Sequence, residues 1–229
     1  MKRARGRADP IDGARPGALG APRRTVLRAI TGCGAALGAA MLEPVRAQGQ
    51  WPAGRPITIV VPFTAGGNVD TTARLIADKL GARLEQSVIV DNVPGAGGVI
   101  GASRVVQSTP DGHTLLMGFE GPIAIARAVN PAAVRFDPAA DLVPVAATTM
   151  APMVIVARPD FPASNMGELI ALAKKQPGKL GYATSGVGTV LHLTMEIIKE
   201  RAGIDIAHVP YKGGAQIATD VIGGHVDLA

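Results

Sequence analysis

Cysteine and aromatic residues are scarce in this sequence. The only cysteine, Cys33, lies near the N-terminus, so the rest of the chain has no thiol. A chain without thiols suits an oxidising compartment, in which a stray thiol is a liability. Aromatic residues make up 3% of the chain, so we expect cores built mainly from Val, Ile, Leu and Ala. The apolar run 29–42 is shorter than the roughly 20 residues that cross a bilayer, which excludes a membrane-spanning helix there.

A basic excess is lacking from most of the chain, although the net charge is +5. Residues 1–47 hold nine of the 23 Lys and Arg residues but only three of the 18 Asp and Glu residues. The remainder therefore has 14 basic and 15 acidic side chains and is close to neutral. Nucleic-acid binding depends on basic side chains that neutralise phosphates, so a nucleic-acid partner is not expected.

Residues 1–47 have the pattern of a signal peptide or leader for export. Val45-Arg46-Ala47 places small residues where a signal peptidase acts, so we predict cleavage after Ala47 and a periplasmic location. The pair Arg23-Arg24 resembles a twin-arginine signal, and an ordinary secretory signal fits equally well. A lipoprotein box ending at Cys33 is disfavoured, because the apolar stretch follows the cysteine. Residues 1–22 either lengthen the leader or precede the true start.

Strand-like and helix-like segments alternate after the leader. Such alternation predicts an α/β fold with parallel sheets and helices on both faces. The last segment opens a strand without a closing helix, so we expect the C-terminal part to be missing. Strands are expected at 57–63, 87–91, 114–117, 180–184, 206–209 and 225–229, extended segments at 142–157, and helices at 70–84, 99–107, 164–175, 189–201 and through Ile217 and Val221. Ser164 is the expected cap of the helix at 164–175, and Val190, Leu193 and Ile197 are expected on one face of the helix at 189–201.

Two glycine-rich loops, each between an apolar strand and a helix, carry the functional argument. The first loop, Thr64 to Asp70, contains Gly66-Gly67, and the second, Thr184 to Thr189, contains Gly186 and Gly188. Glycines let backbone N–H groups turn towards a ligand, and the helix behind each loop adds free N–H groups and a positive dipole end. Each loop is therefore a candidate anion site, although either loop alone also fits an ordinary connection between a strand and a helix.

Five motifs, in this order along the chain, resemble the tripartite tricarboxylate transporter receptors, the Bug family. The resemblance extends from about Trp51 to Ala229. The motifs are Val61-Pro62-Phe63 with Gly66-Gly67 and Asp70; Asp91 to Gly98; Pro110 to Leu116; Tyr182 to Leu193; and His208-Val209-Pro210-Tyr211-Lys212-Gly213-Gly214-Ala215.

The resemblance implies a two-lobed type II periplasmic binding protein fold. Lobe I would cover 51–150, lacking its C-terminal return, and lobe II would cover 151–229. The function implied is an extracytoplasmic receptor, acting as a monomer, that captures a small carboxylate ligand for two membrane transporter subunits. Such a receptor needs no cofactor.

The resemblance also indicates which residues contact the ligand. Relatives hold a carboxylate with backbone amides and hydroxyls rather than arginine, and both loops of this chain lack Arg and Lys. Glu120 adds a carboxylate where relatives carry Ser, Thr or His, which suggests a ligand with an apolar or amine-bearing part. The expected ligand contacts are Phe63, Thr64, Ala65, Gly66, Gly67, Phe119, Glu120, Ser185, Gly186, Val187, Gly188, Thr189 and His192.

Alternative functions find less support in the sequence. Ser185 lacks the glycine two residues earlier that a hydrolase nucleophile elbow requires, since that residue is Ala183. The stretch 95–100, which includes Gly97, ends in Ile100 where a dinucleotide-binding fingerprint has glycine, so it is interpreted as a packed helix entry. The four histidines show no metal-ligand spacing, so neither a metal site nor an enzyme is expected. A periplasmic sensor using the same site without a transporter remains an open alternative.

Overall fold

The fold was obtained as a computed structural model in which residues 51–52 and 54–229 are described. The predicted leader 1–47, its cleavage after Ala47, the arginine pair and Cys33 lie outside the described residues. The described residues from Trp51 onward belong to one compact unit, which spans Gly49–Ala229.

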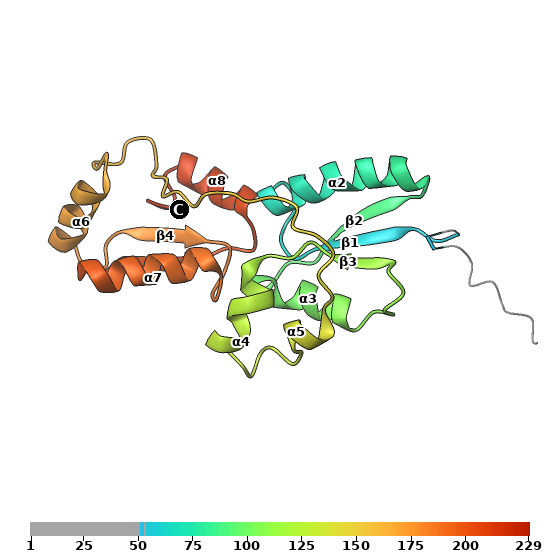
Figure 1. Cartoon of the computed structure of the whole chain (residues 1–229). Coiled ribbons are helices and arrows are strands. Elements are labelled where there is room, and N and C mark those ends of the chain that lie inside the picture. Colours follow the sequence, from blue (N-terminus) through green and yellow to red (C-terminus); the bar gives the residue numbers. More distant parts are fainter. Residues whose placement is uncertain (1–50, 53) are drawn as a thin grey trace, which may run out of the picture. The chain divides into compact units, whose positions relative to one another are not determined.

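A three-stranded parallel sheet forms the first half of the described chain (Figure 1). Strand β1 (Ile57–Val61) lies in the middle, with β2 (Val88–Asn92) on one side and β3 (Thr114–Leu116) on the other. Val60 and Val61 of β1 are fully buried. The continuous β-branched run therefore marks the central strand, which is covered on both faces.

Two helices cover opposite faces of this sheet (Figure 1). Helix α2 (Asn68–Leu84) packs Ala73 and Ala77 against β1, and helix α3 (Val99–Val106) lies on the other face. A 3₁₀ turn, η1 (Ala96–Gly98), leads into α3. A π-helical turn, η2 (Gly121–Ile125), then continues into α4 (Ala126–Val129), and α5 (Pro138–Asp141) follows.

The second half of the chain contains a smaller parallel sheet. Strand β4 (Gly181–Thr184) pairs with β5 (Ala207–Pro210). Leu228 forms single bridges to Tyr182 and to Ala157. The helices of this half are α6 (Met166–Lys175), α7 (Val190–Ala202) and α8 (Gly214–Ile222).

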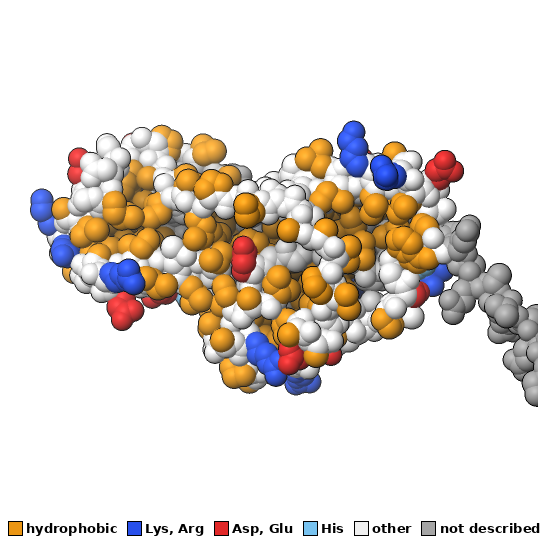
Figure 2. Space-filling model, in the orientation of Figure 1, with side chains coloured by type: hydrophobic (Ala, Val, Ile, Leu, Met, Phe, Trp, Pro, Cys, Tyr) orange, Lys and Arg blue, Asp and Glu red, His pale blue; other side chains and the backbone are white. Residues whose placement is uncertain are grey.

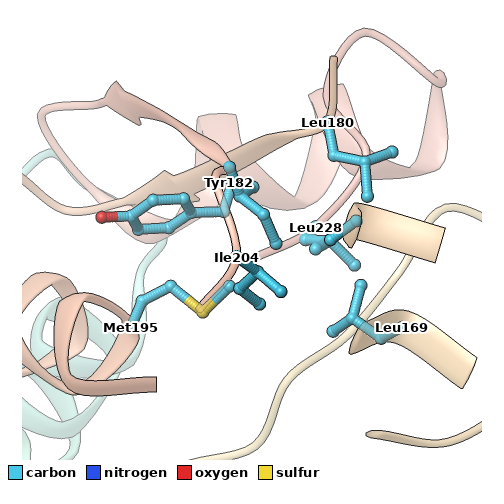
Figure 3. Close-up of a cluster of buried hydrophobic side chains, with 8 residues drawn as sticks. Leu169, Leu180, Tyr182, Met195, Ile204 and Leu228 are labelled. Carbon is cyan, nitrogen blue, oxygen red and sulfur yellow. The ribbon is translucent and has the colours of Figure 1, made fainter. Parts of the chain in front are cut away.

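The core of the second half is aliphatic, as the scarcity of aromatics predicts. Figure 3 shows Leu169, Leu180, Ile204 and Leu228 converging, with Met195 of α7 beside them. The ring of Tyr182 extends away from this cluster with its hydroxyl outermost (Figure 3). Tyr182 is thus buried, yet its polar end reaches other groups.

The extended segments expected at 142–157 pair through their backbone only near their end, where Val156 bonds with Ala229 and Ala157 bridges to Leu228. Three details of the sequence prediction are wrong. Residues 225–229 form no strand, and among them only Leu228 forms bridges. Helix α6 is capped by Asn165, whose side chain accepts from the amide of Glu168, and not by Ser164. Helix α7 buries Met195, whereas Ile197 is half exposed, because the helix turns its apolar face towards Leu180 and Ile204.

The alternating pattern, by contrast, is confirmed as an α/β fold with parallel sheets. Figure 2 shows Lys and Arg side chains scattered over the face drawn, with no continuous basic surface on it. No helix in the described part of the chain is both long and apolar enough to span a membrane.

Candidate functional site

The first loop connects β1 to α2 and is held in place by a buried carboxylate. Asp70 accepts hydrogen bonds from the amide of Gly66 (2.8 Å), from Arg74 Nε (3.0 Å) and from Asn92 Nδ2 (2.9 Å). Asn92 Nδ2 also donates to the carbonyl oxygen of Phe63. The end of β2 therefore fixes the backbone at the end of β1.

The surroundings of Asp70 keep it ionised. Burial alone would raise the pKa of this carboxyl, but the hydrogen bonds from Arg74, Gly66 and Asn92 outweigh burial and lower its pKa. Arg74 is the side chain that neutralises this charge, at 3.0 Å. Asp70 thus supports the loop from the first turn of α2, where a carboxylate and a basic residue one turn later stabilise each other.

The second loop connects β4 to α7. Thr189 caps the helix: its hydroxyl accepts from the amide of His192 and donates to the carbonyl oxygen of Gly186 at 2.8 Å. Thr184 Oγ1 also accepts from the amide of Gly186, at 3.2 Å. The hydroxyls of Thr184 and Thr189 are therefore occupied in shaping the loop.

A third glycine-rich segment packs directly on the second loop. Gly97 has a left-handed φ of 60°, and a Cβ placed on it would lie 2.6 Å from the carbonyl oxygen of Val187. A Cβ on Gly186 would lie 3.1 Å from Gly97 Cα, and one on Gly121 would lie 3.0 Å from Gly97 O. These backbones approach one another so closely that only glycine fits.

The first loop in turn packs on the residues that follow β5. The amide of Thr64 donates to the carbonyl oxygen of Lys212. A Cβ on Gly67 would lie 3.4 Å from the amide nitrogen of Gly214, and one on Gly66 would touch Ala215. Thr64 Oγ1 is buried and has no hydrogen-bond partner within the described residues. A buried hydroxyl of this kind needs a hydrogen-bond partner that the described residues do not supply.

The structure brings most of the predicted site residues together around these contacts. Phe63 is buried against Phe119, with their rings edge to face at 5.5 Å. Glu120 is exposed and precedes η2. The remaining predicted residues lie in the two loops: Thr64, Ala65, Gly66 and Gly67 in the first, and Ser185, Gly186, Val187, Gly188 and Thr189 in the second.

His192 differs from the other predicted residues. It lies in the first turn of α7, where its Nδ1 is 3.5 Å from the amide of Gly188. Its ring centroid is 4.3 Å from that of His208, on β5. His192 is therefore part of a contact between α7 and β5, next to the second loop.

Sequence reasoning missed two parts of the site. Gly97 was interpreted as part of a helix entry, and Gly213 lay within a family motif without an assigned role. A Cβ on Gly213 would lie 2.1 Å from Thr64 Oγ1. Paired glycines shortly after a strand were the available signal in both places, because such pairs permit close backbone approach.

The geometry suits an anion held by main-chain groups. Both loops follow the carboxyl ends of parallel strands, where ligands bind in open sheets, and both lead into helix N-termini. Neither the first loop (64–67) nor the second (185–189) contains Lys or Arg. Within the described residues, no cluster of three or more His, Cys, Asp or Glu could hold a metal ion. Two shallow depressions, of about 470 and 340 Å³, lie on α7 and α2 away from the loops.

Comparisons with known proteins agree with this geometry. Residues 72–229 match the sequence model of the tripartite tricarboxylate transporter family receptor. A UPF0065 protein from Bordetella pertussis is 43% identical over 176 residues, which are 76% of this chain and 54% of that protein. The chain thus spans about half the length of this relative.

Two solved structures are also similar. MatC from Rhodopseudomonas palustris with bound malate is 34% identical, with a TM-score of 0.72, covering 77% of this chain and 60% of that one. A second R. palustris protein, solved with adipate, is 36% identical, with a TM-score of 0.66, covering 78% of this chain and 59% of that one.

Proposed function

The chain belongs to the tripartite tricarboxylate transporter receptor family, and from this premise we propose that it captures a small carboxylate outside the cytoplasm. The observation that carries the proposal is the pair of glycine-rich loops after β1 and β4. Each loop presents backbone N–H groups at the start of a helix, and these groups bind anionic oxygens without a cationic side chain.

The proposed ligand contacts are the loop residues rather than a salt bridge. Thr64 Oγ1 and the amides of Gly67 and Gly188 are the donors we assign to the carboxylate, whereas the amide of Gly66 is already engaged by Asp70. Ser185 is buried, and its hydroxyl forms no hydrogen bond within the described residues, so it is assigned as a further donor. The malate and adipate bound by two similar proteins support a dicarboxylate as the first ligand class to test.

Glu120 and the aromatic pair Phe63 and Phe119 restrict the chemical class of the ligand further. Glu120 is an exposed carboxylate next to Phe119, whose ring contacts the buried Phe63. It repels a second anionic group and favours an apolar or amine-bearing one. We therefore expect a ligand with one carboxylate end, held by the loops, and an end without negative charge near Glu120 to bind more tightly than a dicarboxylate.

A thermal-shift screen of the full-length mature protein tests the function. We expect a dicarboxylate or an amino-carboxylate to raise Tm, and the matching diamide, which lacks the charge, to have no effect. Failure of every carboxylate to raise Tm, with a positive shift from an uncharged compound, would show that the anion-site assignment is wrong.

Two biological roles are compatible with capture of a carboxylate. Uptake through two membrane transporter subunits is the one that the family favours, and sensing without a transporter is the second. Deleting the gene separates the two, because only uptake predicts that accumulation of the labelled ligand stops. Within residues 51–52 and 54–229, no group of three or more His, Cys, Asp or Glu could hold a metal ion for a metal-dependent enzyme.

Export is part of the proposal. We propose that residues 1–47 direct the chain to the periplasm and are removed after Ala47, with the lobes at 51–150 and 151–229 remaining in the mature protein. N-terminal sequencing of the periplasmic form should find Gln48 first. Replacing Arg23-Arg24 by Lys-Lys should block export if the twin-arginine route is used and leave secretory export intact.

A further inference from the structure

A chain of polar contacts runs behind the second loop, from β4 through β5 to α7. The ring of His208, on β5, stacks on Tyr182 with centroids 4.9 Å apart. The hydroxyl of Tyr182 donates to Glu196 at 2.6 Å, and Lys199 Nζ lies 2.8 Å from the same carboxylate. The Glu196 side chain is 41% exposed, and the hydrogen bonds from Tyr182 and Lys199 hold its carboxylate in place.

His208 joins this chain to the loop through one hydroxyl. His208 Nε2 lies 2.7 Å from Thr184 Oγ1. That hydroxyl is also 3.2 Å from the amide of Gly186 and 3.3 Å from its carbonyl oxygen. Thr184 has one proton to donate, so His208 Nε2 and the Gly186 carbonyl compete for it.

The proton on His208 Nε2 decides this competition: the protonated ring always carries it, and the neutral ring lacks it in the tautomer whose proton is on Nδ1. When Nε2 is unprotonated, it accepts the Thr184 proton, and the Gly186 carbonyl is left to Thr189, which donates to it at 2.8 Å. When Nε2 carries a proton, it donates to Thr184 instead, and the Thr184 hydroxyl turns to the Gly186 carbonyl. The hydrogen bonds of the loop backbone therefore differ between the two states.

The groups that face His208 come from two neighbouring elements. Strand β4 contributes Tyr182 and Thr184, and helix α7 contributes His192, Glu196 and Lys199. Burial lowers the pKa of His208, the positive charges of His192 and Lys199 lower it further, and Glu196 opposes them. At 4.3 Å between ring centroids, His192 and His208 repel each other when both are protonated.

We propose that His208 is a positioning residue that sets the shape of the second loop through Thr184, so that its protonation loosens the hold on the ligand in mild acid. This inference rests on the proposed capture of a carboxylate by that loop. In this proposal, His208 affects binding only through the second loop and makes no contact with the ligand.

The first test follows the loop itself and needs no ligand. In the full-length protein, the backbone amide NMR resonance of Gly186 should shift as the pH falls below about 6.5, the ordinary histidine value, because the pKa of His208 is lowered from it. The shift should vanish in His208→Gln and Thr184→Val and persist in Thr184→Ser, which keeps the hydroxyl. A Gly186 resonance that is independent of pH, or that still titrates in His208→Gln, would overturn the proposal.

The second test measures binding of malate and adipate by calorimetry at pH values from about 4.5 to 7.5, a range that extends well below the ordinary histidine pKa of about 6.5. The ligand carboxyls also begin to take up protons at the acid end, so unmodified protein and His208→Gln are compared at each pH. We expect the affinity of the unmodified protein to fall about tenfold towards acid, as loss of one good hydrogen bond would produce. His208→Gln should bind more weakly at neutral pH and show a flat profile. His225→Asn, at an exposed histidine, is the control that should keep the wild-type profile.

The two tests separate the possible failures. If neither compound nor any other carboxylate binds at any pH, the proposed function fails, and the Gly186 titration still decides the role of His208. If a carboxylate binds with a profile that His208→Gln leaves unchanged, the function stands and the role of His208 is wrong.

Discussion

The amide of Thr64 donates a 3.2 Å hydrogen bond to the carbonyl oxygen of Lys212. This bond joins the first loop, after β1, to the segment after β5, although 148 positions separate the two residues in the sequence. Both partners are main-chain groups, so the contact depends on how closely the two backbones approach and not on the Lys212 side chain.

Gly213 should be essential for this approach. A methyl group there would lie 2.1 Å from Thr64 Oγ1 and 2.9 Å from its amide nitrogen. We expect Gly213→Ala to weaken ligand binding of the full-length protein about tenfold or more, because the first loop must move, as measured by calorimetry.

Two variants beside Gly213 serve as controls. A methyl group at Gly214 would meet nothing closer than Gly67 Cα at 3.9 Å, so Gly214→Ala should bind normally. Lys212→Met keeps the carbonyl and should change affinity less than about twofold, a small fraction of a decade. Abolished binding in Lys212→Met alone would instead indicate a salt-bridge site.

Gly97 and Gly203 form a matched pair for measuring backbone contact. Their φ angles are 60° and 61°, but only Gly97 faces another backbone, since a Cβ on Gly203 would meet nothing within 4 Å. Gly203→Ala should cost roughly 1–2 kcal/mol from the left-handed backbone alone. Gly97→Ala should cost about 2–4 kcal/mol, because crowding against Val187 O is added. Urea unfolding measures both, and equal losses would show that the contact at Gly97 is unimportant.

Asp70 should stabilise the protein only while it is ionised. We expect Asp70→Asn to lose roughly 2–3 kcal/mol near neutral pH, because the bonds to Arg74 and the Gly66 amide lose their charge. The pKa of Asp70 is lowered from 3.8 in the folded state. As the pH falls below about 3.8, the unfolded chain takes up the proton first, so the stabilisation is lost in acid.

The measurement for Asp70 is urea unfolding of both proteins at several pH values. The difference between wild type and Asp70→Asn should shrink as the pH falls through this range. Asp78→Asn, at an exposed site on the same helix, should leave stability within about 0.5 kcal/mol. A difference between wild type and Asp70→Asn that is constant with pH would contradict the assigned role of the charge.

Thr189 and Ser185 should differ in what they support. Thr189 is fully buried and caps α7, so Thr189→Val should lower stability by about 1–2 kcal/mol and weaken binding as well. Ser185→Ala should weaken binding about tenfold with little change in stability, if its hydroxyl meets the ligand. Thermal unfolding and calorimetry on both variants distinguish the two roles, and Thr189→Ser is the control that keeps the cap.

The sequence predicted the elements better than their packing. The β-branched run at 57–63 and the helical spacing at 70–84 both correspond to observed elements, because periodicity reports burial directly. Ile197 was predicted to lie on the buried face of α7, but it is half exposed. Apolar residues lie on more than one side of this helix, and the tertiary contacts determine which side is buried. The apolar stretch 142–156 suggested extended segments, but extended backbone becomes a strand only when a partner strand lies beside it.

In the site, too, the local sequence pattern was predictable and the long-range packing was not. The two loops were recognisable because strand, glycines and helix follow one another in the chain. The contacts of Gly97 with Val187 and of Thr64 with Gly213 were not recognisable, because they join segments that lie far apart in sequence. Thr189 was predicted as a ligand contact, and its hydroxyl is engaged by Gly186 and His192. The ligand contacts themselves stay predictions.

The close approach of Gly97 and Gly186 limits how this protein can evolve. No residue is smaller than glycine, and the next step, a single methyl group, already collides with the neighbouring backbone. This contact therefore cannot be adjusted gradually by mutation, and selection can only keep it or lose it. Divergence in ligand preference must accumulate at neighbouring positions whose side chains are free to vary, such as the exposed Glu120 and Val187.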